Sequence, residues 1–354
     1  MFVTVIVFVA ILSILVFIHE LGHFTVARLI GVKVEEFGFG LPPRIWGHKF
    51  GKHGTMYSIN WLPIGGFVKL AGEDDDDSQK SKVKSQQLKE YFFARSKKER
   101  AAILLAGVFM NFLLAVGITT YLLTQGVQET AGRVHIESVL PGGPADKAGL
   151  KKNDIITGYK TPGELIAYVK THAGEEVTLS VLRDTHTIPI TLIPRKEYPK
   201  GEGPTGIAIS DLETKTYPVT QAPGMAVKIN LQRAWEMLSG IGGLVVRLVR
   251  WQPVGQDVAG PIGIAVVTGQ AVKFGWKAVL EFMSILSLNL AVLNVLPIPA
   301  LDGGRLAFVF LEKILGRKVK PAFEQSTHQI GMIVLFILIL LISINDILRL
   351  ARGG

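Results

Sequence analysis

The sequence contains no cysteine among its 354 residues. This absence excludes thiol nucleophiles, disulfide bonds, thiolate-bound zinc and iron–sulfur clusters, so nitrogen and oxygen atoms must hold any metal. Charged residues are also scarce, at 19% against about 25% in an ordinary soluble domain. Hydrophobic residues make up 48% of the chain, and the mean hydropathy is +0.36. Together these values argue against a disordered chain and against an ordinary soluble enzyme.

Long apolar runs account for the high hydropathy. They occupy residues 1–18, 101–123, 278–301 and 330–345. Each run approaches the ~20 residues that a helix needs to cross a hydrocarbon core of ~30 Å. We therefore expect about four transmembrane helices rather than buried helices of a soluble protein. The first run has neither a basic residue before its apolar core nor a small-residue cleavage site, so we expect a retained helix and not a signal peptide.

The distribution of positive charge predicts the orientation of these helices. Lysine and arginine are concentrated in residues 80–100 and 313–320. Loops of this kind lie on the cytoplasmic side of a membrane. This orientation places the N-terminus and residues 125–277 outside the cytoplasm. Arg349 and Arg352 would then also lie outside, which leaves the direction of the last helix open.

The first apolar run leads into a possible metal-binding motif, His19-Glu20-Leu21-Gly22-His23. Helical spacing puts His19 and His23 one turn apart on the same face, where both imidazoles can bind one Zn²⁺. Glu20 lies beside them and can act as a general base toward water at the metal. A pair of structural histidines is the alternative. It is disfavoured because histidine and glutamate inside a membrane are costly and usually functional.

A catalytic zinc site needs a third protein ligand. Asp302 lies about 24 residues into the third apolar run and His19 about 17 residues into the first, so helix geometry puts both toward the cytoplasmic side. Two prolines and two glycines interrupt the helical pattern around Asp302. Broken backbone at membrane depth is tolerated only where it is buried or lines a wet cavity. Asp302 is therefore the best candidate for the third ligand.

Two motifs together resemble a known family. They are His19-Glu20-x-x-His23 and Asn294-x-x-Pro297-x-Pro299-x-Leu301-Asp302-Gly303. This combination resembles the site-2 proteases, and more narrowly the bacterial regulator-of-sigma-E-type zinc intramembrane proteases, over nearly the whole chain. The resemblance implies that His19, His23 and Asp302 bind Zn²⁺ and that Glu20 is the catalytic base. It also implies cleavage of single-pass membrane proteins, such as anti-sigma factors or remnant signal peptides, in the bacterial inner membrane.

Residues 32–70 alternate apolar and polar side chains with many glycines and prolines, which predicts β-hairpins rather than a helix. The family has a membrane-dipping β-hairpin here, and Gly38-Phe39-Gly40 matches one of its elements. We expect Gly38, Phe39 and Gly40 to offer backbone partners to an opened substrate strand. Asn294 is expected to hydrogen-bond that strand from the opposite side. A hairpin on the cytoplasmic surface is the alternative.

Residues 94–115 resemble the family's entry to its second membrane span. The family usually has Ala-Gly-Pro here, whereas this chain has Ala106-Gly107-Val108. Asn111, a few residues later, matches the asparagine of the family's pattern. The departure concerns the local shape of the helix and not the residues expected to carry the chemistry.

Residues 131–195 have a different character. Residues 134–139 and 177–182 look like strands, and residues 143–156 resemble the helix and following strand of a PDZ domain. Asn153 replaces the usual glycine, and asparagine tolerates the positive φ that this turn requires. The length of the match predicts one PDZ domain. A PDZ groove accepts a peptide as an added strand, and a steric gate is the alternative role.

The expected fold is a polytopic α-helical membrane protein with a membrane-associated β-hairpin region and one inserted extracytoplasmic PDZ domain. Residues 225–251 place apolar side chains on one helical stripe, which is typical of a helix on a membrane surface and also of a helix packed in a core. The expected segments are a first membrane half, the PDZ domain, a linker with an amphipathic helix and a second membrane half, at residues 1–124, 125–200, 201–277 and 278–354.

The leading functional hypothesis is a zinc endopeptidase that cuts transmembrane segments near the cytoplasmic side. One alternative is a membrane adaptor with a PDZ domain and a vestigial metal site, but a binding module needs neither Glu20 nor Asp302. Another is a membrane-anchored protease with a cytosolic site, although His19 and His23 continue an apolar span. No phosphate loop or nucleic-acid module is found, so the net charge of +9 indicates attraction to the lipid bilayer. The sequence does not specify an oligomeric state.

Overall fold

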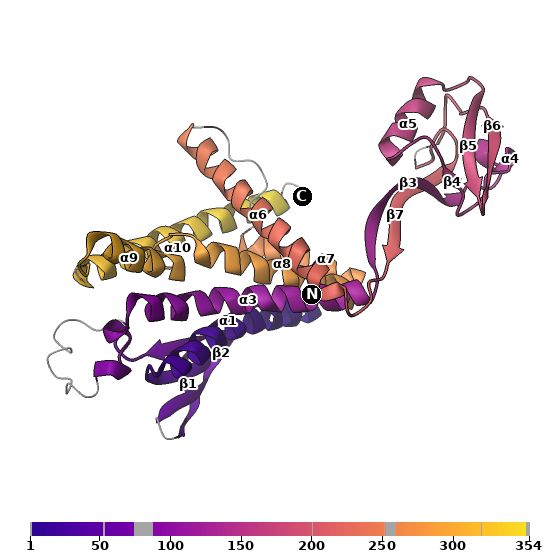
Figure 1. The fold of residues 1–354 in the computed structure, drawn as a ribbon. Helices are drawn as coiled ribbons and strands as arrows, with labels where there is room; N and C mark the ends of the chain where they lie inside the picture. The colour runs from indigo at the N-terminus through magenta and orange to yellow at the C-terminus, as the bar shows by residue number, and fades with distance from the viewer. Residues whose placement is uncertain are drawn as a thin grey trace. The chain divides into compact units, whose positions relative to one another are not determined.

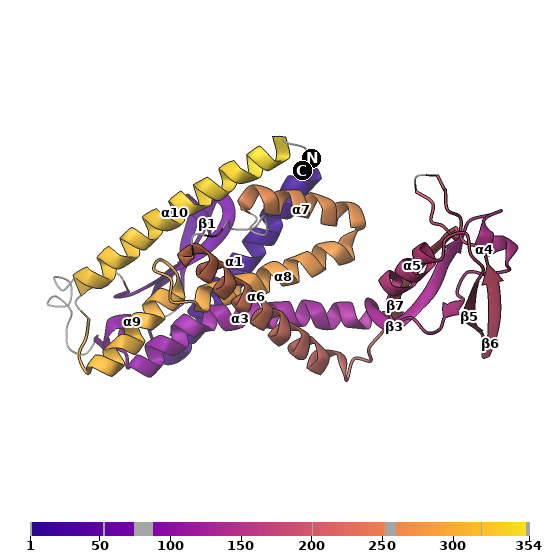
Figure 2. The ribbon, with the colours of Figure 1, turned by 90° about the horizontal axis from the view of Figure 1, so that it is seen from above.

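The computed structural model describes residues 2–51, 54–73, 88–199, 201–250, 252, 260–319 and 321–351. Part of the basic segment 80–100, together with Lys320 and Arg352, lies outside the described residues. The chain divides into two compact units (Figures 1 and 2). The membrane unit consists of Met1–Leu122 and Val219–Gly354, and the sheet unit consists of Leu123–Pro218.

Helices dominate the membrane unit. Among the described residues, four of them are long and apolar enough to cross a membrane, namely α1, α3, α8 and most of α10. These are the helices expected from the apolar runs. A shorter apolar helix, α7, lies in a region expected to be a linker. The bounds are α1 Phe2–Ile30, α3 Lys97–Thr124, α6 Ala222–Val249, α7 Pro261–Phe274, α8 Trp276–Val295, α9 Asp302–Leu315 and α10 Pro321–Ala351.

The third apolar run ends as a helix earlier than its composition suggests. Helix α8 stops at Val295, and Leu296 adopts an extended conformation with ψ of 145°. The cause is Pro297, because a residue that precedes proline is sterically disfavoured in the helical region. Asp302 is therefore not inside this span. It is the first residue of a separate helix, α9, as the interruption expected around Asp302 implies.

Hydrogen bonds between polar side chains and backbone join α3 to α8. Ser287 donates through Oγ to the carbonyl oxygen of Asn111 at 2.8 Å, and Ser284 donates to the carbonyl oxygen of Ala115 at 3.1 Å. Small polar residues of this kind let helix backbones approach closely in lipid, where no hydrophobic driving force brings helices together. They hold α8, and with it Asn294, beside α3.

A buried ion pair joins the start of α3 to α9. Arg100 donates to the carboxylate of Glu312, and the two side chains are only 10% and 4% exposed. The amide of Val319 and the Nζ of Lys97 add bonds to Glu312, at 3.3 Å to Oε1 and 2.8 Å to the carbonyl oxygen. Separation of the two partners would leave uncompensated buried charges, so the pair opposes separation of the start of α3 from α9. This pair helps to set the position of α9, which begins at Asp302.

The β region expected at residues 32–70 is present as two long, bent strands, β1 (Val34–Phe50) and β2 (Thr55–Leu70). Residues 36–39 of β1 pair with residues 66–69 of β2 on one side and with residues 56–59 on the other. Gly38 and Phe39 therefore lie inside the sheet and do not form an open edge. The expectation that they offer free backbone partners to a substrate is corrected, because both sides of this segment are already paired.

Gly40 is likewise engaged within the sheet. Its carbonyl oxygen accepts a hydrogen bond from Nδ2 of Asn60 at 3.1 Å. Its φ of 80° lies in the region that favours glycine, which explains the residue at this bend. Residues 66–70 pair only with β1 and residues 46–50 pair only with β2, so each of these two segments has an open side among the described strands; the amide of Val68, in the first of them, faces Glu20.

The sheet unit contains a five-stranded sheet among its described residues, in the order β6-β5-β4-β3-β7. Its core gathers Val134, Ile136, Ile156, Leu165 and Leu179 between the sheet and helix α5. Asn153 has a φ of 71°, as expected. The elements are β3 Val127–Val139, α4 Pro144–Lys147, β4 Ile155–Ile156, α5 Pro162–Thr171, β5 Val177–Arg183, β6 His186–Leu192 and β7 Ile207–Lys215.

The sheet unit extends beyond the expected boundary at residue 200. Strand β7 pairs with β3 from Val127 opposite Lys215 to Val139 opposite Ile207. Two strands so far apart in the sequence give no local signal that they pair, so the periodicity of residues 201–218 alone did not reveal that they complete this sheet. The linker of the expected organisation therefore begins after Pro218.

Candidate metal centre and active site

Three side chains converge from two helices to form the candidate metal centre. His19 and His23 lie one turn apart on α1, and Asp302 opens α9. Nε2 of His19 lies 2.8 Å from Oδ2 of Asp302 and 3.1 Å from Nε2 of His23. Nε2 of His23 lies 3.2 Å from the same aspartate oxygen. Among the described residues, this is the one group of three such side chains whose ligand atoms come this close.

This donor set fits a zinc ion. Tetrahedral zinc with bonds of about 2.0–2.2 Å requires ligand atoms about 3.3 Å apart, close to the three separations observed here. Hydrogen bonds alone explain the cluster poorly, because one proton on His19 Nε2 cannot satisfy both the imidazole of His23 and the carboxylate of Asp302. A cation between the three atoms removes that conflict. The absence of cysteine is compatible with this set of two imidazoles and one carboxylate.

Both histidine rings are oriented by groups on α3. Nδ1 of His23 lies 2.8 Å from the carbonyl oxygen of Ile103, so Nδ1–H donates there and Nε2 is left for the metal. Nδ1 of His19 lies 3.2 Å from the side-chain amide of Asn111, which is fully buried. A metal-binding His19 carries its proton on Nδ1 and needs an acceptor. The Oδ1 of Asn111, which has no other hydrogen-bond partner in the described part of the chain, supplies one when the amide is turned.

Two glycines create the space for the site. A Cβ atom on Gly107 would lie 2.6 Å from Nε2 of His23 and 2.7 Å from Nε2 of His19, so any side chain would occupy the position of the ligands. A Cβ on Gly22 would collide with the backbone of Ala106. Glycine at both positions lets α1 and α3 approach closely enough for α3 to cover the histidines.

The approach to Asp302 is a tight chain reversal. A Cβ on Gly303 would collide with the carbonyl group of Leu296, and a Cβ on Gly304 would lie 2.5 Å from the carbonyl oxygen of Ile298. The Asp-Gly-Gly sequence therefore lets the loop fold back over the first turn of α9. The amide of Ala300 donates to Nδ1 of His328 on α10 at 3.0 Å, which anchors the same loop from the other side.

Glu20 and Asn294 lie beside the three ligands. Oε2 of Glu20 accepts a hydrogen bond from the amide of Val68 at 3.0 Å, which ties the carboxylate to the open side of β2. Nδ2 of Asn294, at the end of α8, lies 3.5 Å from Nε2 of His19. A candidate general base, an amide donor and a metal centre thus share one buried location, which is a suitable arrangement for hydrolysis of a carbonyl compound.

The structure brings together five of the residues singled out from the sequence: His19, Glu20, His23, Asn294 and Asp302. Gly38, Phe39 and Gly40 lie in the neighbouring sheet but have their backbones paired within it. Sequence reasoning missed the contributions of Gly107, Asn111 and Val68. The signals available were the resemblance of residues 94–115 to the family's second span, which includes Gly107 and Asn111, and the rarity of a strongly polar residue such as Asn111 in this run. Nothing in the local sequence indicates that the amide of Val68 faces Glu20.

Asn111→Leu is expected to weaken zinc binding by about 10–100-fold, the usual cost of losing a partner that orients a metal-binding histidine. The shape of the side chain is nearly kept, but His19 loses the acceptor for its Nδ1 proton. Competition with a chromophoric chelator measures the affinity. Thr119→Val, which removes a buried polar group from the same helix, is the control. Equal zinc affinities for the two variants would contradict the role of Asn111.

Comparison with known proteins places this geometry in a family. Peptidase family M50 matches residues 7–338. A protein of Clostridium perfringens is 32% identical, over 95% of this chain and 96% of its own length. The zinc metalloprotease RasP of Oceanobacillus iheyensis is 28% identical, over 98% of this chain and 99% of its own length. RasP of Geobacillus kaustophilus is 27% identical, over 97% of both chains. With its ligand set, its four apolar helices and these matches, the chain belongs to peptidase family M50, the site-2 proteases, and is a zinc metalloprotease of membranes.

Proposed function

We propose that this protein is an endopeptidase that cuts the transmembrane segments of single-pass membrane proteins. The observation that carries the proposal is the position of His19, Glu20 and His23 within α1, a helix that is apolar along its length. The two histidines are buried and Asp302 is half-buried, and the three lie between α1, α3 and α9 and not on a soluble domain. Substrates that reach such a site must themselves enter the bilayer.

The residues of the site have separate tasks in peptide hydrolysis. His19, His23 and Asp302 hold zinc, which when bound supplies Lewis-acid activation of water and of the scissile carbonyl. Glu20 accepts the proton of the attacking water and returns it to the leaving amine. Nδ2 of Asn294 donates to the carbonyl oxygen of the substrate, where negative charge develops. Burial of the site keeps bulk water away and strengthens these interactions.

The open side of β2 is the place for the substrate backbone. A helical substrate shields its scissile carbonyl within its own hydrogen bonds, so it must be extended before hydrolysis. Segment Gly66–Leu70 lies next to Glu20, as the bond from the amide of Val68 to that carboxylate indicates. A substrate strand that pairs with this segment regains backbone hydrogen bonds, each of which costs several kcal/mol when left unmade in lipid. This assignment replaces the expected one to Gly38, Phe39 and Gly40.

The proposal includes a location and an orientation. The lysine- and arginine-rich segments 80–100 and 313–320 face the cytoplasm, the protein lies in a bacterial inner membrane, and the sheet unit lies outside. Helix α6 lies on the membrane surface, because its stripe residues Leu231, Trp235 and Val245 are exposed and not packed in a core. The substrates are anti-sigma factors or remnant signal peptides.

The sheet unit is proposed to be the PDZ domain. Strand β7 is an end strand among the described residues of the sheet, and a cavity of about 260 Å³ lies between it and α5. Leu165 and Val169 of α5 and Ile207 and Ile209 of β7 line this cavity. An edge strand beside an apolar groove suits an extended peptide.

The test is the position of the cut. The purified protein is reconstituted with a reporter whose only transmembrane segment is flanked by soluble tags, and the product termini are mapped by mass spectrometry. Cleavage inside the apolar segment is expected. A cut confined to the flanking loops would assign the site to cytosolic peptides. Absence of any cut with zinc bound would favour the adaptor hypothesis.

Val68→Pro tests the open strand. Proline removes the amide that faces Glu20 and is tolerated on the outer side of an edge strand. We expect slower cleavage, with partial recovery when glycine or proline in the substrate helix lowers the cost of unwinding. The measurement is the cleavage rate of the stable and the weakened reporter by both enzymes, at matched zinc content. An equal slowing of both reporters would show that Val68 acts only on Glu20 and does not hold the substrate.

A further inference from the structure

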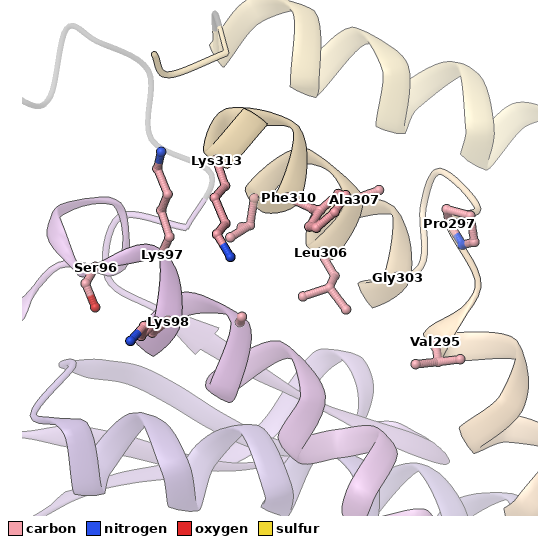
Figure 3. Close-up of a pocket in the computed structure, with 12 residues that line it drawn as sticks. Ser96, Lys97, Lys98, Val295, Pro297, Gly303, Leu306, Ala307, Phe310 and Lys313 are labelled. Carbon is pink, nitrogen blue, oxygen red and sulfur yellow. The ribbon is translucent and has the colours of Figure 1, made fainter. Parts of the chain in front are cut away.

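A cavity of about 780 Å³ lies between the start of α3, the end of α8 and α9 (Figure 3). Three lysines and Ser96 mark its polar part, and every other lining residue is apolar or glycine. Leu306 and Lys313 reach from α9 into the space beside α3 (Figure 3). The volume lies within the range of cavities that hold small ligands. Val295 and Gly303, which line it, are next in sequence to Asn294 and Asp302, but neither of those two residues lines the cavity itself.

The charged residues that line this cavity in the described part of the chain have one sign. They are Lys97, Lys98 and Lys313, and no acidic residue is among the described lining residues. Glu312, the nearest acid along α9, is turned to Arg100. Lys98 and Lys313 are exposed, whereas Lys97 is half-buried and donates to the carbonyl oxygen of Glu312. Lys98 and Lys313 are therefore the two cations best placed to meet a bound anion.

The apolar part of the cavity continues onto an exposed apolar side of α9. Phe310 lines the cavity and is 62% exposed, and Ile314 on the next turn is 67% exposed. Helix α3, whose first residue is Lys97, is itself a candidate membrane span. Lys97 and Lys98 thus lie at the start of a candidate span, and the apolar lining lies beside it. An occupant that matches both parts has an anionic head and a hydrocarbon tail.

We propose that this cavity binds an anionic phospholipid, with its phosphate between Lys98 and Lys313 and one acyl chain against Leu306, Ala307 and Phe310. Basic pockets between membrane helices recognise anionic head groups in this way. A transmembrane substrate fits less well, because the residues that flank such segments on the positively charged side of a protein are themselves basic. The lipid would bridge α3 and α9, the helices that Arg100 and Glu312 also join.

The first experiment measures the lipid that the full-length protein retains. The zinc-loaded protein is purified in mild detergent, and bound phospholipid is identified by native mass spectrometry. We expect about one anionic phospholipid per chain, and at least a fivefold loss in Lys98→Gln/Lys313→Gln. Both positions are exposed, so little change in folding is expected. Lys152→Gln/Lys273→Gln removes the same charge elsewhere and should retain the lipid. Equal retention by the two double variants would overturn the proposal.

A second variant tests the hydrocarbon part separately. Ala307→Trp fills the cavity and keeps all three lysines, so it should also lose the lipid. Retention by this variant would mean that the head group binds at the surface without the cavity, and would overturn the site. Zinc content, measured on every variant, reports whether the neighbouring Asp302 and Gly303 remain in place.

Thermal unfolding distinguishes the possible occupants. Nanodiscs of phosphatidylcholine with increasing phosphatidylglycerol should raise the unfolding midpoint of the unmodified protein and of the control, but not of Lys98→Gln/Lys313→Gln. An equal effect of inorganic phosphate would assign the lysines to a soluble anion. Displacement of the retained lipid by a reporter transmembrane segment would assign the cavity to substrate. Either result would overturn the lipid site.

Discussion

Glu20→Gln is expected to abolish detectable cleavage while zinc stays bound. Glutamine keeps the size of the side chain and its contact with the amide of Val68, but it cannot accept the proton of the attacking water. Loss of a general base costs about 10²–10⁴-fold in rate. Because Glu20 is not among the three converging ligands, the metal affinity should not change. The measurement is reporter cleavage together with zinc content of the same preparation.

Glu236→Gln is the matched control for this change. Glu236 is an exposed glutamate on α6, and its nearest side-chain partner is Gln232, at 2.9 Å. The same chemical substitution there should leave both cleavage and zinc content unchanged. An active Glu20→Gln enzyme would remove Glu20 from the catalytic role. Loss of zinc from this variant would instead make Glu20 part of the metal centre.

Asp302→Ala is expected to lower zinc affinity by more than the 10–100-fold that is typical of an orienting partner, because it removes one of three ligands. Cleavage should fall in parallel. The ligand atoms of His19 and His23 stay on α1, so weak residual binding is expected and not complete loss. Zinc affinity is measured by chelator competition, and occupancy by elemental analysis.

The position of Asp302 at the first residue of α9 requires a second variant. An acid in the first turn of a helix also contributes about 0.3–1 kcal/mol through the helix dipole. Asp302→Ser keeps an oxygen acceptor for the free amides at the start of the helix but gives no carboxylate to the metal. If both variants lose zinc to the same extent, the effect belongs to the ligand. Unchanged zinc affinity in either variant would mean that Asp302 is not a ligand.

The two experiments separate binding of the metal from its use. Glu20→Gln should give a zinc-loaded inactive enzyme, and Asp302→Ala an enzyme that lacks both zinc and activity. Asn111→Leu should lie between them, with weakened affinity and activity that returns at high zinc concentration. This ordering is expected because Asp302 converges with both histidines, Asn111 lies against the ring of His19, and Glu20 is bonded to the amide of Val68 and is not one of the three converging side chains.

Local features of this protein follow directly from its sequence. The length and apolarity of α1, α3, α8 and α10 require nothing beyond the thickness of a bilayer. The pairing of His19 with His23 requires only one helical turn, and Glu20 is then beside them. The alternation of apolar and polar side chains in residues 32–70 indicates strands. This signal is also local, because the backbone of each strand alone sets the two-residue period.

Contacts between distant segments were decided by the tertiary structure. Asp302 meets His19 across 283 positions of sequence. The meeting depends on the reversal at Pro297–Gly304 and on the ion pair between Arg100 and Glu312. Which strand segments are open depends on how β1 and β2 pair, and this pairing is the reason that the proposed substrate edge lies at residues 66–70 and not at residues 38–40. The pairing of β7 with β3 was also decided by the tertiary structure. The alternation of apolar and polar residues in a strand does not indicate which distant strand it pairs with.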